Sequence, residues 1–195
     1  MKSNPASTFG HSLFAALLAL AALPVSGAEL APCLECHGEN GERRTPDTPA
    51  LGGQSEFYLL TQLALFRQGR RDNAEMVRVA KAMSDDELRA YAAAAAKLPP
   101  PEPPASAPDR DRFARGEALA RQHRCVICHG ANLAGTDQVP RLANQREAYL
   151  LKALRGFKSS RRIGYGQAGV LMIEILTPLS DDDLVDLAHY LSHIR

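Results

Sequence analysis

The sequence predicts an all-α fold made of two tandem repeats. Apolar residues recur near the 3.6-residue period of a helix in several segments, and two of these segments begin with the helix-capping pattern Ser-Asp-Asp. Alternating apolar and polar residues, which would predict strands, are rare. A block of matching residues also occurs twice at one spacing, so the chain contains the same helical unit in two copies.

The first segment, residues 1–28, is expected to be a signal peptide. Lys2 precedes an apolar run from Leu13 to Leu23, and small residues follow up to Ala28. A basic start, about 7–15 apolar residues and a small-residue end are typical of a secretory signal. The alternative is an uncleaved anchor, although the run is shorter than the roughly 20 residues that span a bilayer. We therefore expect export to the periplasm, with membrane association only if the signal is uncleaved.

The repeat is defined by two sets of matching positions. Pro, Leu, Gln, Tyr, Leu-Leu, Phe and Arg-Arg follow one another in the same order in residues 49–71 and 140–162, at an offset of 91 residues. A second match, at an offset of 96 residues, pairs Met76 with Met172 and one Ser-Asp-Asp sequence with the other. Chance does not align this many positions.

The repeat predicts the domain boundaries. We expect a first domain at 29–98 and a second domain at 109–195, with a linker at 99–108 between them. The linker is rich in proline, which lacks a backbone donor and favours extended polyproline II. It is therefore expected to be a semi-rigid spacer.

The predicted helices follow the same order in both domains. In the first domain Ser55 caps one helix, and Ser84 begins a second with a capping-box sequence. Their counterparts are expected at 146–158 and from Ser180 onward. The second domain has a further helical segment at 111–124, before its cysteines, for which the first domain has almost no room.

All four cysteines lie in two copies of the pentapeptide Cys-x-x-Cys-His. The copies comprise Cys33, Cys36 and His37, and Cys125, Cys128 and His129. This pentapeptide is typical of covalent haem attachment, in which both thiols form thioethers and the imidazole binds iron. Zinc bound by four thiolates and a redox dithiol are the alternatives. The two pairs lie 92 residues apart, against roughly 15–20 in single zinc modules, so we predict two covalently bound haem c groups.

Iron in such a site needs a second axial ligand. Met76 and Met172 each stand eight residues before a capping serine, so they occupy equivalent positions in the two domains. A single Met on an apolar helix is more often a core residue, but the matching positions favour a role as iron ligands. His123, His189 and His193 have no counterparts in the first domain, and we expect them to be solvated or structural.

The charge of the chain is close to balanced. It has 23 Lys and Arg against 22 Asp and Glu, for a net charge of +1. This leaves no strongly basic field for nucleic acid, so no nucleic-acid partner is expected. The sequence also shows no Ser/His/Asp set and no paired carboxylates of the kind that hydrolytic enzymes use.

Taken together, these features resemble the diheme cytochrome c4 family, in which two class I cytochrome c domains stand in tandem. The resemblance rests on Cys-x-x-Cys-His-Gly, on Pro-x-Leu-x-x-Gln followed by Tyr-Leu, and on a Met eight residues before a Ser-Asp helix start. These motifs span nearly the whole chain after residue 28. The resemblance implies one imidazole and one thioether for each iron, in the pairs His37 with Met76 and His129 with Met172.

The resemblance also implies a role for two prolines. Pro49 and Pro140 are expected to offer their carbonyl oxygens to the ring N–H of His37 and His129. Such a contact fixes the tautomer of a metal-bound imidazole and increases its basicity. The alternative for these prolines is simple loop punctuation.

The first domain departs from the family pattern. In class I domains a glycine of the N-terminal helix contacts an aromatic of the C-terminal helix, and Gly116 with Tyr190 fits this role in the second domain. In the first domain that helix is largely missing, and Ala94 stands where Tyr190 would be, inside a run of alanines. We expect the alanine face either to be covered by the second domain or to serve as a docking surface. The first domain is also expected to be the less stable one.

Two Arg-Arg pairs recur at the offset of 91 residues. They are Arg70 with Arg71, and Arg161 with Arg162. Their recurrence favours a role at the haems, either neutralising propionates or forming a docking rim. Simple surface exposure is the alternative.

The function implied is single-electron transfer between respiratory-chain partners, by an electron carrier that is not an enzyme. The expected partners are redox proteins: quinol–cytochrome c reductase, a terminal oxidase or a dehydrogenase. One alternative is the electron-accepting cytochrome subunit of a periplasmic dehydrogenase. A diheme peroxidase-type enzyme is a further alternative, and it would need one iron with an open or displaceable ligand.

Overall fold

The computed structural model describes residues 29–38 and 47–194, so the predicted signal peptide at 1–28 lies outside the described residues. All regular elements of the described part are helices, as the sequence predicted. Among them, no helix combines the length and the apolar character that crossing a membrane would require.

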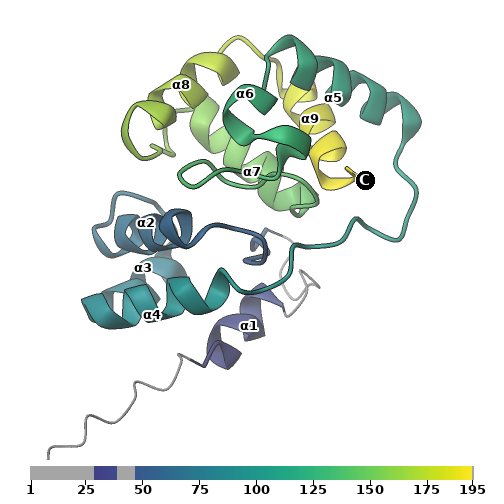
Figure 1. The fold of residues 1–195 in the computed structure, drawn as a ribbon. Helices are drawn as coiled ribbons and strands as arrows, with labels where there is room; N and C mark the ends of the chain where they lie inside the picture. The colour runs from purple at the N-terminus through teal and green to yellow at the C-terminus, as the bar shows by residue number, and fades with distance from the viewer. Residues whose placement is uncertain (1–28, 39–46, 195) are drawn as a thin grey trace, which may run out of the picture.

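The first domain is the lower one in Figure 1. Its helices are α1 (Ala31–His37), α2 (Glu56–Arg67), α3 (Ala74–Lys81) and α4 (Asp85–Ala95). α2 packs against α3 and α4. The first Cys-x-x-Cys-His motif lies on α1 itself, so no helix precedes the motif in the described part of this domain.

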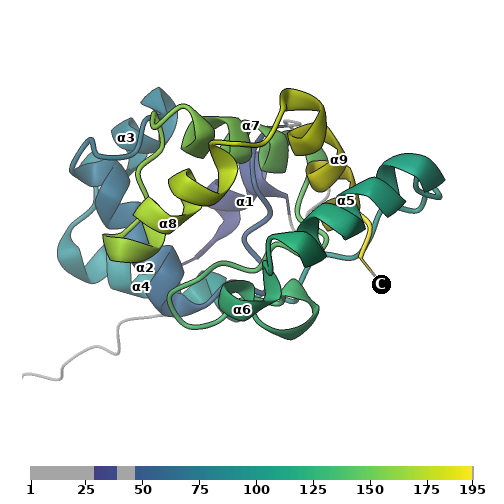
Figure 2. The same cartoon turned by 90° about the horizontal axis from the view of Figure 1, so that it is seen from above.

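The second domain contains one helix more than the first before its motif and lies above it in Figure 1. Its elements are α5 (Arg110–Gln122), α6 (Val126–His129), the short 3-10 helix η1 (Ala131–Leu133), α7 (Glu147–Lys158), α8 (Gly166–Leu176) and α9 (Asp181–Ser192). α9 packs against α5 and α7, and α7 also packs against α8. Figure 2 shows α5 and α9 side by side, with α6 at the end of α5.

The predicted helix starts are present with their caps. The Ser55 hydroxyl accepts a hydrogen bond from the backbone N–H of Tyr58 at the start of α2. Ser84 begins α4 with a complete capping box, and Ser180 begins α9 in the same way. Because a capping box satisfies orphan donors at the helix N-terminus, these starts are determined locally.

The two domains have cores of different size. In the second domain α9 contributes Leu184, Leu187 and Leu191 to a continuous apolar core. In the first domain the corresponding buried cluster on α4 is mainly Ala92 and Ala95 against α2. Since buried area sets the hydrophobic stabilisation, the alanines contribute less than leucines would.

Part of the alanine run is covered within the first domain, whereas the covering or docking role expected for the face at Ala94 stays a prediction. Ala92 and Ala95 are 1% and 4% exposed because they pack on Leu59 of α2, within their own domain. Ala94, at the position equivalent to Tyr190, is half-buried. The run therefore makes up part of the core of the first domain.

The expected contact between Gly116 and Tyr190 is present in the second domain. A Cβ on Gly116 would lie 2.2 Å from the carbonyl oxygen of Asp186 and 2.6 Å from the Cβ of Tyr190. Only glycine permits this approach of α5 to α9. The ring of Phe113 meets the ring of Tyr190 edge-on, with 5.0 Å between the centroids.

Residues 99–108 form no helix or strand and connect α4 to α5. The start of this segment packs against the loop before α2, because a Cβ on Gly52 would lie 1.9 Å from the carbonyl oxygen of Pro99. Pro101 is buried. The proline-rich segment is therefore partly held against the first domain.

Candidate haem sites and their surroundings

Both Cys-x-x-Cys-His motifs lie at short helices in which the second cysteine is exposed and the imidazole is buried. The first cysteine of each motif, Cys33 or Cys125, is half-buried, whereas Cys36 and Cys128 are exposed. His37 and His129 are only 7% and 5% exposed. Each helical turn therefore offers two thiols for covalent attachment and one imidazole facing the protein interior. His129 lies at the end of the helix α6.

The two imidazoles are oriented in the same way. His37 Nδ1 lies 2.8 Å from the Pro49 carbonyl oxygen, and His129 Nδ1 lies 2.8 Å from the Pro140 carbonyl oxygen. A ring that donates its Nδ1 proton keeps the lone pair of Nε2 for a metal. In the part of the chain that the structure describes, neither Nε2 makes a hydrogen bond.

The surroundings of both rings favour the neutral imidazole. Burial lowers the pKa of His37 and of His129, and the hydrogen bond to the proline carbonyl opposes this in part. At His37 the positive charges of Arg146 and Arg71 lower the pKa further. A neutral imidazole is the form that binds a metal, so these residues fit the iron of a covalently bound haem.

The four thiols do not form one zinc site. The two motifs lie in different domains (Figure 1). Among the described residues, the potential metal ligands that come within 4.8 Å of one another in a group of three belong to Glu147, His189 and His193. Burial raises the pKa of Cys33 and of Cys125, and the second thiol of each motif adds to this. Protonated, separated thiols fit two haem attachments better than a thiolate cluster.

The group of Glu147, His189 and His193 is explained by hydrogen bonds. Glu147 Oε2 lies 3.0 Å from His189 Nδ1, and His189 Nε2 accepts from the backbone N–H of Asp109 at 3.0 Å. Arg112 Nη2 donates to Glu147 Oε1 at 2.7 Å. With both ring nitrogens paired and a cation on the carboxylate, His189 has a structural role, one of the two roles that we expected.

The two candidate axial methionines lie on equivalent helices of unequal length. Met76 is in the first turn of α3, where its backbone N–H donates to the side chain of the N-cap Asn73 at 2.9 Å. Met172 is in the middle of α8 and packs against the core of the second domain. Both side chains are half-buried. Their role as iron ligands stays a prediction.

The four predicted arginines divide into two kinds. Arg70 and Arg161 are exposed, whereas Arg71 and Arg162 are half-buried between the domains. Arg71 Nη2 donates to the hydroxyl of Tyr149 at 2.9 Å, which crosses from the first domain to the second. A role at the haem propionates stays a prediction for all four.

Arg162 makes the reciprocal contact. Its Nη2 donates to the hydroxyl of Tyr58 in the first domain at 3.3 Å, and its Nη1 donates to Tyr149 at 3.4 Å. Its guanidinium also lies over the ring of Phe157, as the guanidinium of Arg71 lies over Phe66. Tyr58 and Tyr149 recur at the offset of 91 residues, but the repeat alone does not indicate this contact.

This Arg–Tyr cluster changes the acidity of a phenol. Burial alone would raise the pKa of Tyr149, but the guanidiniums of Arg162 and Arg71 outweigh burial and lower the pKa to about 7. Opposite charges close to a buried group favour its ionised form. The interface between the domains is therefore a polar, charged one.

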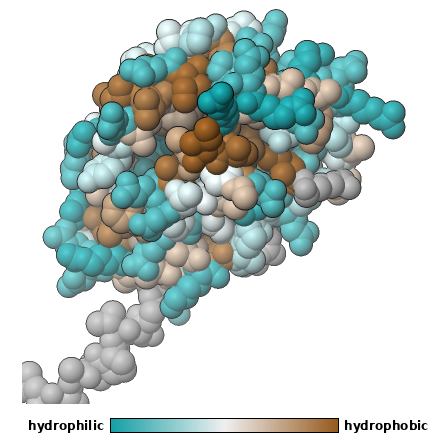
Figure 3. Space-filling model, turned by 45° about the horizontal axis from the view of Figure 1, so that its top comes forward, coloured by the Kyte–Doolittle hydropathy of each residue, from teal (hydrophilic) through white to brown (hydrophobic). Residues whose placement is uncertain are grey.

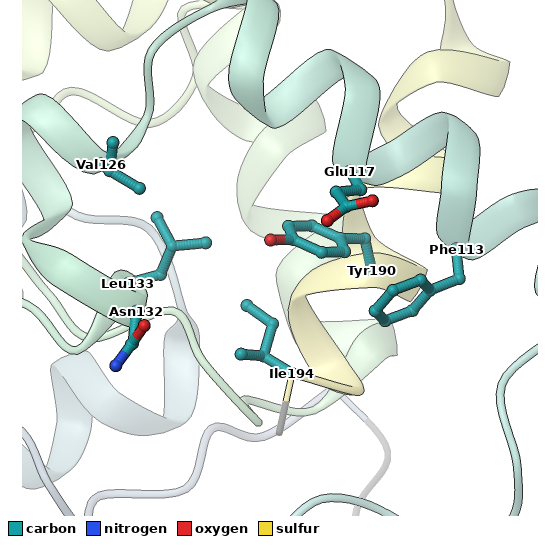
Figure 4. Close-up of a pocket in the computed structure, with 7 residues that line it drawn as sticks. All are labelled: Phe113, Glu117, Val126, Asn132, Leu133, Tyr190 and Ile194. Carbon is teal, nitrogen blue, oxygen red and sulfur yellow. The ribbon is translucent and has the colours of Figure 1, made fainter.

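Apolar side chains surround the second motif. A pocket of about 260 Å³ lies between α5, α9 and the motif helix. Figure 4 shows Phe113, Tyr190 and Ile194 on one side of it and Val126 and Leu133 on the other. Glu117 and Asn132 also line this pocket, so its wall combines apolar and polar side chains.

Exposed apolar residues are found at the second motif and next to Met172. Val126 and Ile127, between the second pair of cysteines, are 52% and 71% exposed. Val170 and Leu171, directly before Met172, are 50% and 43% exposed. Figure 3 shows brown, hydrophobic areas among the polar residues on one face of the molecule. Such areas are typical of interaction sites.

Comparisons with known proteins agree with this geometry. A family model for cytochrome c matches residues 113–195. The chain is 34% identical over 167 residues to a thiosulfate dehydrogenase electron acceptor of Thiomonas intermedia, covering 81% of this chain and 76% of the relative. It is 31% identical to cytochrome c4 of Pseudomonas aeruginosa, covering 86% of each chain.

A solved structure supports the same assignment. Reduced recombinant cytochrome c4 from Pseudomonas stutzeri aligns with a TM-score of 0.75 and 29% identity, covering 85% of this chain and 95% of that one. The motifs, the two helical domains and these similarities together confirm the resemblance seen in the sequence. The chain belongs to the cytochrome c4 family of diheme c-type cytochromes.

Proposed function

We propose that this protein carries single electrons between respiratory-chain partners in the periplasm through two covalently bound haem c groups. The observation that carries the proposal is the pair of matching sites, each with a Cys-x-x-Cys-His helix and an imidazole held at 2.8 Å by a proline carbonyl. When bound, the haem supplies the one-electron chemistry. The chain itself anchors the group, orients the ligand and limits access of water.

The residues of each site have distinct roles in this proposal. Cys33 and Cys36 anchor the first haem and His37 ligates its iron. In the second site, anchoring falls to Cys125 and Cys128, and ligation to His129. We place Met76 and Met172 at the second axial positions, since they recur at matching positions and each lies on the helix that precedes the C-terminal helix of its domain.

Replacing each methionine tests this assignment. Met76→Ala and Met172→Ala are expected each to remove the sulfur-to-iron absorbance band of one site and to lower the midpoint potential of that site only, because Met raises the potential of haem iron. Met83→Ala is the matched control, since Met83 is half-buried and corresponds to Leu179 in the second domain. Unchanged absorbance and midpoint in Met76→Ala or Met172→Ala would rule out that residue as a ligand.

A second candidate function is the role of dedicated electron acceptor for a dehydrogenase. It is favoured by the similarity to the thiosulfate dehydrogenase electron acceptor of Thiomonas intermedia. Rapid reduction by a thiosulfate dehydrogenase with thiosulfate, together with copurification of the two proteins, would support this role over that of a freely diffusing carrier. A diheme peroxidase would instead show an open iron position in one site.

A further inference from the structure

The domains are joined by two glutamine side chains that each pair with a backbone segment of the opposite domain. Gln54 Nε2 donates to the carbonyl oxygen of Arg141 at 2.9 Å, and Gln54 Oε1 accepts from the backbone N–H of Arg141 at 3.0 Å. Gln145 pairs with Ala50 in the same way, at 2.9 Å and 2.8 Å. The two glutamines are only 7% and 3% exposed.

The pairing is reciprocal. Gln145 is the counterpart of Gln54 at the offset of 91 residues, and Arg141 is the counterpart of Ala50. Each domain therefore uses the same side chain to hold the same backbone position of the other. If the backbone of either domain were displaced by one residue relative to the other domain, both glutamine–backbone pairs would be broken.

The residues held in this way adjoin the proline carbonyls that orient the imidazoles. The peptide group between Pro49 and Ala50 binds His37 through its carbonyl oxygen and Gln145 through its N–H. A peptide group is one planar, conjugated unit, so a hydrogen bond at its N–H increases the negative charge on its oxygen. Gln145 of the second domain thus strengthens the hydrogen bond to the iron ligand of the first.

The same arrangement links Gln54 of the first domain to the imidazole of the second. The peptide group between Pro140 and Arg141 binds His129 through its oxygen and Gln54 through its N–H. Gln54 and Gln145 therefore each act, through one peptide group, on the imidazole of the other domain.

Arg146 adds a contact to the first site only. Its Nη2 donates to the carbonyl oxygen of His37 at 2.7 Å and its Nη1 to that of Thr48 at 2.6 Å. The counterpart of Arg146 in the first domain is Ser55, a neutral residue that contacts the carbonyl oxygen of Asp137. The second domain thus brings a positive charge to the first haem site, and among the described residues no arginine makes the equivalent contact at the second.

We propose that Gln145 and Arg146 are positioning residues for the first haem and that Gln54 is a positioning residue for the second, so that each midpoint potential depends on the opposite domain. This inference rests on the proposed function. A stronger hydrogen bond to the imidazole makes it more basic and favours ferric iron. The charge of Arg146 favours ferrous iron.

The glutamines are tested by Gln145→Leu and Gln54→Leu, with Gln68→Leu and Gln122→Leu as controls at exposed positions, one in each domain. The midpoint of each haem is measured by redox titration of the full-length holoprotein, with the two haems distinguished by assigned proton NMR signals. Gln145→Leu is expected to raise the midpoint of the haem on Cys33 and Cys36 and to leave the other within the spread of the controls. Gln54→Leu is expected to do the reverse.

Three results would overturn the proposal: a shift in the haem of the substituted domain itself, equal shifts at both haems, or no shift in a folded variant. Arg146→Gln and Arg146→Lys carry the test if a buried leucine prevents folding, because Arg146 is only half-buried. Arg146→Gln should lower the midpoint of the first haem alone, and Arg146→Lys should keep it closer to wild type. Equal shifts at both haems, or none, would again refute the idea.

The visible spectrum of the wild-type protein distinguishes a failure of this inference from a failure of the proposed function. Suppose that the wild-type protein binds two redox-active haems, but that substitutions in one domain do not shift the midpoint potential of the haem in the other. That result would refute only this inference. A wild-type protein without covalently bound haem would remove the proposed function.

Discussion

Several contacts around the haem sites are made to backbone carbonyl oxygens. Pro49 and Pro140 contribute a carbonyl oxygen, which any residue possesses, and the proline ring fixes the backbone that carries it. Arg146 likewise binds two carbonyl oxygens of the first domain. Sequence motifs identify such residues as recurring positions but do not show which atom makes the contact.

The contribution of Glu147 to the stability of the fold is expected to depend on pH. Burial tends to raise its pKa, but hydrogen bonds from His189 and Arg112 outweigh this and hold the pKa below its ordinary value. A depressed carboxyl pKa adds stability above the ordinary pKa, and this stability is lost as the pH falls through the folded-state value. For a partly exposed pair the contribution is up to about 1 kcal/mol.

Glu147→Gln should therefore lower the melting temperature at pH 7 and flatten its decline towards acid pH. The measurement is a series of thermal melts of the holoprotein from neutral to acid pH. Glu174→Gln, at an exposed position of α8, is the control. An acid decline as steep as that of the wild type would show that Glu147 does not contribute.

At the scale of helices, the crossing of α5 and α9 depends on Gly116. Helix propensity alone favours alanine over glycine by about 1 kcal/mol. A Cβ would, however, lie 2.2 Å from the Asp186 carbonyl oxygen, which is backbone and cannot rotate away. Overpacking of this kind costs about 1–3 kcal/mol, so the packing effect is expected to exceed the propensity effect.

Gly116→Ala is thus expected to destabilise the second domain. Thermal melts should show a fall of several degrees, since 1 kcal/mol corresponds to about 4–8 °C in a domain of this size. Ala118→Ser, at an exposed position of the same helix, should change the melting temperature much less. A variant as stable as the wild type would mean that α5 moves away from α9 without cost.

At the scale of the whole molecule, the two domains are unequal. α9 buries several leucines and is covered by α5 and α7, whereas α4 buries mainly Leu88, Ala92 and Ala95. Local stability follows the number of buried apolar contacts. We therefore expect the first domain to depend more on its haem and on the interface with the second domain.

Hydrogen exchange of the full-length holoprotein can measure this difference. Backbone amides of α4 should exchange faster than those of α9, because opening α4 exposes less apolar surface. Peptide-resolved exchange followed by mass spectrometry gives both rates in one experiment. Equal protection of the two helices would contradict the expected difference in stability.

Much of this architecture could be predicted from the sequence because its signals are local. The capping boxes at Ser84 and Ser180 and the two motifs follow from short patterns, and the Gly116–Tyr190 contact follows from the resemblance to class I domains. The partition of Arg70 and Arg71 into an exposed and an interface residue did not follow, because adjacent residues in a repeat carry the same signal.

The sequence by itself determined the helical repeat, the two haem motifs and the shortened first domain, since each depends on residue types at fixed spacings. Only the tertiary structure decided that Gln54 holds Arg141 while Gln145 holds Ala50, and that Arg71 meets Tyr149. These contacts depend on how one domain is oriented on the other. That orientation arises from interactions between residues nearly a hundred positions apart, which leave no periodic pattern along the chain.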